Sequence, residues 1–117
     1  MKEEFIISSK KEARIIIITP EMAKYWIENY SKGELKPSKT IVRLMASQMR
    51  SGKWISTPDP ICFSSDKRLI NGRVRLKASV LSNVSFRALI VTGVDPFETM
   101  DIISRKEKRD ERRPRNR

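Results

Sequence analysis

Four consecutive isoleucines, at residues 15 to 18, stand directly before a Thr-Pro-Glu sequence at residues 19 to 21. β-Branched side chains favour a strand, and a continuous apolar run is typical of a strand that is buried on both faces. Thr19 suits the N-cap of a helix, Pro20 its first position and Glu21 the positive end of its dipole. The chain must therefore pass from strand to helix at once, which predicts a fold that mixes the two.

The remainder of the chain continues this mixture of helix and strand signals. The first helix is expected to carry Met22, Trp26 and Tyr30 on one face and to end near Gly33. A second helix is expected after Pro37, with Ser38 as its N-cap and its end at Gly52, and the side chain of Trp54 is expected to pack over the core. The further elements expected are a hairpin over 60–70, a helix over 73–81, a strand over 86–94 and a short last helix over 96–103. This order predicts an α+β domain over residues 13 to 103, built around a small mixed β-sheet. Residues 1–12 are expected to be a flexible lead-in, and 104–117 a basic disordered tail.

Two helices of this domain have predicted inner and outer faces. In the second helix the expected inner stripe follows helical spacing and consists of Ile41, Leu44, Met45 and Met49. Three basic residues, Lys39, Arg43 and Arg50, are expected to project on the opposite face. In the third helix Leu76 and Val80 are expected to point inward. The basic face of the second helix is either a binding surface or an ordinary solvated face.

Charge is the strongest signal in the composition. The chain has 25 Lys and Arg against 14 Asp and Glu, a net charge of +11, of which the last fourteen residues carry +5 and the other 103 carry +6. Between residues 36 and 87 there are eleven basic and two acidic side chains. Such a balance points first to nucleic acid, whose phosphates dominate binding of this kind. A solubilising surface charge and an anionic membrane surface are the other interpretations.

The composition also excludes several kinds of chemistry. The chain has 117 residues, which suffices for one small domain, and it contains no histidine and a single cysteine, Cys62. Serine–histidine and cysteine–histidine nucleophile pairs, histidine-ligated zinc and an internal disulfide are therefore excluded. The first residues lack the apolar run of a signal peptide, and no stretch is long enough to span a membrane. We expect a cytoplasmic, nucleoid-associated protein without a metal or cofactor.

Four stretches of the chain together resemble a known family. They are ITPEMAKYW at 18–26, MRSGKW at 49–54, NGRVRL at 71–76 and VTGVDPFETMD at 91–101. In this order they resemble the ParB N-terminal/sulfiredoxin-like superfamily, and in particular the ParB-like proteins of phages and mobile elements. The resemblance covers roughly residues 13 to 103. It implies a two-stranded approach, a glycine turn and a helix, in a protein that acts near DNA.

The glycine turn departs from the family pattern Asp-Gly-Gln-His-Arg-Leu. Asn71 stands where the family has an acidic side chain, Arg73 where it has an amide or acidic one, and Val74 where it has a basic one. The other three positions, Gly72, Arg75 and Leu76, agree with the family pattern. Cleavage or transfer of phosphate needs a base or a metal anchor, usually a carboxylate. No Asp or Glu occurs between residues 67 and 87. The turn is therefore expected to hold a phosphate without acting on it.

The favoured interpretation is a non-catalytic protein that binds duplex DNA through its phosphates. One alternative is a protein-binding module that inhibits or redirects a host factor. The other is a nucleotide hydrolase or nuclease that uses Glu98 or Asp101. For Arg75 there is a further alternative, a structural role in which it ties the turn to the hairpin. The residues expected to contact nucleic acid are Lys39, Arg43, Arg50, Lys53, Arg68, Asn71, Gly72, Arg73, Arg75, Lys77, Arg109, Arg112 and Arg113.

Overall fold

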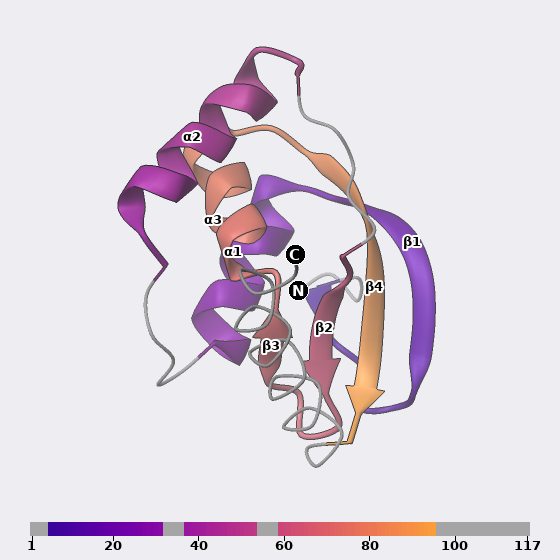
Figure 1. Ribbon diagram of the computed structural model, residues 1–117. Coiled ribbons are helices and arrows are strands. Elements are labelled where there is room, and N and C mark those ends of the chain that lie inside the picture. Colours follow the sequence, from indigo (N-terminus) through magenta and orange to yellow (C-terminus); the bar gives the residue numbers. More distant parts are fainter. Residues whose placement is uncertain (1–4, 32–36, 54–58, 96–117) are drawn as a thin grey trace, which may run out of the picture.

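A computed structural model of the chain describes residues 5–31, 37–53 and 59–95. Its elements are, in chain order, β1 (Glu12–Ile18), α1 (Pro20–Tyr30), α2 (Lys39–Arg50), β2 (Ile61–Ser64), β3 (Leu69–Asn71), α3 (Arg73–Ser82) and β4 (Phe86–Val94). The four strands form one mixed sheet in the order β1-β4-β2-β3. Figure 1 shows the three helices gathered on one side of this sheet. The predicted α+β class with a small mixed sheet is confirmed.

The order and the directions of the strands follow from the path of the chain. β2 and β3 form an antiparallel hairpin, and α3 then carries the chain back so that β4 lies parallel to β2. β1 pairs with β4 in antiparallel fashion along its whole length, from Glu12 opposite Thr92 to Ile18 opposite Phe86. β4 is thus a central strand although it comes last, and β1 is an edge strand although it carries the isoleucine run.

The prediction that the isoleucine run is buried on both faces is wrong. Ile18 is fully buried, whereas Ile15 and Ile17 are 60% and 64% exposed. The reason is the position of β1 at the edge of a sheet whose helices all pack on one side (Figure 1). Side chains alternate between the two faces of a strand, so every second isoleucine points away from the helices.

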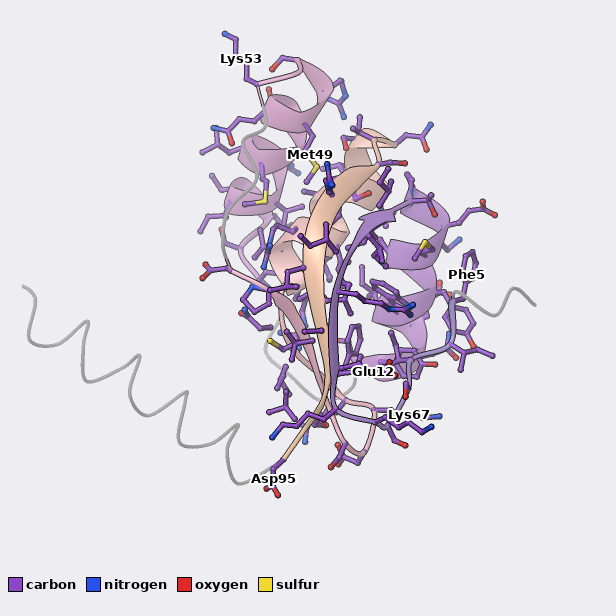
Figure 2. All side chains as sticks on the ribbon, turned by 90° about the vertical axis from the view of Figure 1, so that its right-hand side faces the viewer. Phe5, Glu12, Met49, Lys53, Lys67 and Asp95 are labelled. Atoms are coloured by element: carbon purple, nitrogen blue, oxygen red, sulfur yellow. The ribbon has the colours of Figure 1, made fainter. Side chains whose placement is uncertain are left out.

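The hydrophobic core lies between the helices and the sheet. The indole ring of Trp26 in α1 packs edge-on against Phe63 in β2, with 5.3 Å between ring centroids. Its Nε1 donates a 2.8 Å hydrogen bond to the backbone oxygen of Phe5, and the buried Ile7 donates one of 3.3 Å from its backbone N–H to Tyr30 Oη. Figure 2 shows Phe5 next to α1. The segment from Phe5 onward therefore packs on the domain, in contrast to the flexible lead-in expected for residues 1–12.

The helix boundaries follow the capping residues predicted from the sequence. Thr19 Oγ1 accepts a 3.2 Å hydrogen bond from the backbone N–H of Met22, and Ser38 Oγ accepts one of 3.4 Å from Ile41. Gly52 follows α2 with a φ of +78°. Gly33, Trp54 and the expected helix over 96–103 lie outside the described residues. No helix in the described ranges is long and apolar enough to cross a bilayer.

Candidate nucleic-acid interface

The inner face of α2 differs from the predicted one. Val42, Ala46 and Met49 are buried, whereas Ile41 and Leu44 are 51% and 62% exposed. The apolar side chains of this helix span an arc of about 200°, from Leu44 to Ala46, so its periodicity fits more than one orientation. The small side chain of Ala46 lets the backbone of α2 come close to α3, its main packing partner. The predicted inner positions of Ile41 and Leu44 are therefore wrong.

The three basic residues of α2 still share one side of the helix. We call Lys39, Arg43 and Arg50 the α2 ridge; all three are exposed. At about 100° per residue they lie roughly 60° to 100° from Val42, on the flank of the helix rather than opposite its buried face. Arg50 Nη2 donates a 3.3 Å hydrogen bond to the backbone oxygen of Leu81, so this flank adjoins the end of α3.

The charged residues of α2 and α3 are all of one sign. Helices α2 and α3 contain six basic residues and no acidic one. The side chains of Lys39 and Arg43 form no hydrogen bond or ion pair with the described part of the chain. Lys53 continues the ridge beyond α2 and projects into solvent at the top of Figure 2. Lys77, which is half-buried on α3, lies on the neighbouring helix. These cations are available to phosphate groups.

The glycine turn begins α3 with a backbone that glycine alone adopts readily. Gly72 is the N-cap of α3 and has φ +105° and ψ +10°. A Cβ at this position would overlap Ile61 Cδ1 and lie 3.3 Å from Ile61 Cα. The turn is thus pressed against the first residue of β2. Packing on the sheet accounts for Gly72 without a bound anion.

Arg75, the family-like arginine of the turn, points into the protein. It is 7% exposed, and its Nη1 and Nη2 donate hydrogen bonds of 2.6 and 3.1 Å to the backbone oxygens of Asp59 and Pro60. Burial lowers the pKa of the guanidinium from its ordinary value, and the nearby Asp59 and Cys62 act in the opposite direction. Asn71 Nδ2 donates to the same Pro60 oxygen at 2.8 Å. This geometry favours the structural role of Arg75, holding the turn to the start of the hairpin.

The other two arginines near the turn are placed differently. Arg73 Nε donates a 2.9 Å hydrogen bond to Ser31 Oγ, and its Nη2 lies 3.5 Å from the backbone oxygen of Leu69. Arg68 is exposed on the β2–β3 hairpin, next to Lys67. Figure 2 shows Lys67 at the opposite end of the molecule from Lys53. The structure therefore separates Arg68 from the α2 ridge.

An open pocket of about 420 Å³ lies beside the glycine turn, and Asp59 is the acidic residue among the described ones that line it. Across the described ranges, no three His, Cys, Asp or Glu side chains gather in a group that would hold a metal ion. Arg109, Arg112 and Arg113 of the tail lie outside the described residues, as do Glu98 and Asp101.

Comparisons of the chain with protein-family models, with curated proteins and with solved structures gave no match. The ParB-like resemblance therefore stays a prediction, and the case for a function rests on the geometry. The sequence did not decide which basic residues are buried in the fold and which are exposed on its surface. Arg75 lies inside the fold, because backbone oxygens far away in the sequence bind it. Lys39, Arg43 and Lys53 lie outside it.

Proposed function

We propose that this protein binds duplex DNA through the α2 ridge. The observation that carries the proposal is the exposure of Lys39, Arg43 and Arg50 on one flank of α2, in a pair of helices, α2 and α3, that has six basic residues, Arg75 alone among them buried, and no acidic one. Cations that have no internal ion pair attract phosphate without first giving up a partner. The described residues as a whole carry fourteen basic and six acidic side chains, so the field outside the ridge supports the same partner.

The length of the ridge fits the dimensions of DNA. Lys39 and Arg50 are eleven residues apart, which corresponds to about 16 Å along a helix. The major groove of B-DNA is about 12 Å wide. A helix laid across or along the groove would place cations near phosphates on both of its walls, with Lys53 extending the contact. Such contacts hold the backbone and read little sequence.

The aromatic residues favour duplex over single-stranded nucleic acid as the ligand. Proteins that hold single strands stack bases on exposed aromatic rings. Every aromatic side chain in the described ranges is buried or half-buried, and Trp26, Phe63 and Phe86 belong to the core. Phosphate contact is then the interaction that remains, and a duplex presents phosphates more densely than a single strand does.

In this proposal the glycine turn is less important for binding than the α2 ridge. Because Arg75 donates to two backbone oxygens, it positions the turn and the start of α3. The tail, with Arg109, Arg112 and Arg113, is expected to add non-specific attraction through its net charge of +5. The proposed role is binding, and the α2 ridge is its principal element.

The proposal is tested by fluorescence anisotropy with a random-sequence duplex and the double variant Lys39→Gln/Arg43→Gln. Its matched control is Arg14→Gln/Arg87→Gln, which removes the same charge from exposed positions on β1 and β4. We expect the ridge variant to bind about tenfold or more weakly than the control, since each phosphate contact is a charge-assisted hydrogen bond. Equal affinity of the two variants would show that total charge matters and the ridge does not.

A further inference from the structure

A groove of about 400 Å³ lies where the three helices meet. Its floor and walls are apolar: Val42 comes from α2, Ile27 from α1, and Val80 and Leu81 from α3. Val80 and Leu81 are 38% and 52% exposed. The predicted inward position of Val80 is therefore wrong, because this side chain lines the groove instead of the core.

The lining residues follow the spacing of two helix faces. α1 contributes Lys24, Ile27 and Glu28, and α3 contributes Lys77, Val80 and Leu81. Both sets have the i, i+3, i+4 spacing that places side chains on one face of a helix. A channel between two such faces matches the shape of a third helix that lays its own apolar stripe between them. Of the possible ligands, a helix is the one that this lining favours.

The charged residues at the rim of the groove indicate which net charge a bound helix would have. Lys24 and Lys77 line the groove, and the guanidinium of Arg50 lies at its end, on the backbone oxygen of Leu81. Among the described residues that line the groove, Glu28 is the acidic one. Three cations against one carboxylate favour a partner with acidic residues beside its apolar stripe.

We propose that this groove docks an acidic amphipathic helix from a partner protein. The helix would place apolar side chains at i, i+3 or i+4, and i+7 over Val80 and Leu81, with Glu or Asp toward Lys24 and Lys77. The floor of this groove is separate from DNA binding, because it is apolar and a phosphate backbone gains nothing from contact with it, whereas Arg50 and Lys77 at its rim adjoin both surfaces. The test therefore changes a floor residue, Leu81, so that the two proposals can fail independently.

The test uses a display library of helical peptides of about 16 residues, randomised on their surface and selected against the full-length protein. The enriched peptides are then measured against Leu81→Ser and against its matched control Leu44→Ser, a leucine of similar exposure on α2 outside the groove. We expect acidic sequences with apolar helical spacing, and about tenfold or greater loss of affinity for Leu81→Ser alone. Lys77→Gln should also weaken these peptides.

Three results would overturn the proposal. The library yields no binders; the binders lack acidic residues or helical spacing; or Leu44→Ser weakens them as much as Leu81→Ser does. Circular dichroism spectra of the two serine variants check that both remain folded. Duplex binding measured on the same Leu81→Ser protein separates the two proposals, since its loss together with peptide binding would indicate one shared surface.

Discussion

The guanidinium of Arg75 donates a 2.6 Å hydrogen bond to the backbone oxygen of Asp59, sixteen residues earlier in the chain. A second bond of 3.1 Å joins it to the oxygen of Pro60, which also accepts from Asn71. These bonds connect the N-terminal turn of α3 to the start of β2. Among the basic residues near the turn, Arg75 is the buried one, so its charge is satisfied within the fold.

Replacement of Arg75 by Ala should destabilise the protein. Loss of the guanidinium removes the hydrogen bond to the Asp59 oxygen and one of the bonds to the Pro60 oxygen, which costs about 1–3 kcal/mol. The measurement is the free energy of unfolding from urea denaturation, with Arg43→Ala as the control because Arg43 is exposed. Arg43→Ala should change stability by less than about 0.5 kcal/mol. An Arg75→Ala protein with unchanged stability but weakened DNA affinity would indicate that Arg75 binds a phosphate instead.

Alanine at Gly72 should cost more than alanine at Gly52. Both glycines have positive φ, +105° and +78°, but a Cβ at Gly52 meets no atom within 4 Å, whereas one at Gly72 would overlap Ile61. Gly52→Ala should lose about 1–2 kcal/mol from backbone strain alone. Gly72→Ala should lose a further 1–3 kcal/mol, roughly, from overpacking. Equal losses in urea denaturation would mean that the close contact with β2 is relieved at no cost.

In the first described segment, Ile7 should contribute to the stability of the protein, whereas its neighbour Ile6 should not. Ile7 is 4% exposed and Ile6 is 47% exposed. Truncation of a buried isoleucine to alanine costs about 2–5 kcal/mol, whereas exposed positions stay within about 0.5 kcal/mol. Thermal unfolding of Ile7→Ala and Ile6→Ala measures the difference. Similar melting temperatures would support a loose lead-in instead of a packed one.

Features set by neighbouring residues could be predicted from the sequence. Thr19 and Ser38 cap their helices because an N-cap needs only a side-chain oxygen two or three residues before a free N–H. The hairpin and the third helix follow from equally local signals. The α+β class is the sum of such elements, so it too could be predicted.

Features that depend on how the strands and helices assemble could not be predicted from the sequence. The exposure of Ile15 depends on the place of β1 at an edge, and a run of isoleucines looks the same in a central strand. The orientation of α2 depends on which of its many apolar side chains meets α3. The burial of Arg75 depends on backbone oxygens of Asp59 and Pro60, which leave no mark in the side-chain sequence. For the candidate site, the exposed basic residues of α2 could be predicted, whereas for Arg75 the sequence left a structural role and a phosphate-binding role open as alternatives.

Deletion of residues 105–117 should weaken duplex binding without loss of the fold. These residues carry a net charge of +5 and no aliphatic side chain. Their removal should therefore lower affinity most at low salt, where phosphate attraction is strongest. Anisotropy at two salt concentrations and a thermal melt of the truncated protein check both parts. Unchanged affinity at both concentrations would exclude Arg109, Arg112 and Arg113 from the interface.

The most direct test of DNA binding by the α2 ridge is the salt dependence of duplex affinity. The logarithm of the binding constant falls with the logarithm of salt concentration by about 0.9 for each phosphate contact. Lys39→Gln/Arg43→Gln should therefore show a slope less steep than the wild type by roughly 1.8 if both side chains contact phosphates. Arg14→Gln/Arg87→Gln should keep the wild-type slope. Parallel lines for the wild type and the ridge variant, or a wild type whose affinity does not depend on salt, would contradict the proposed function.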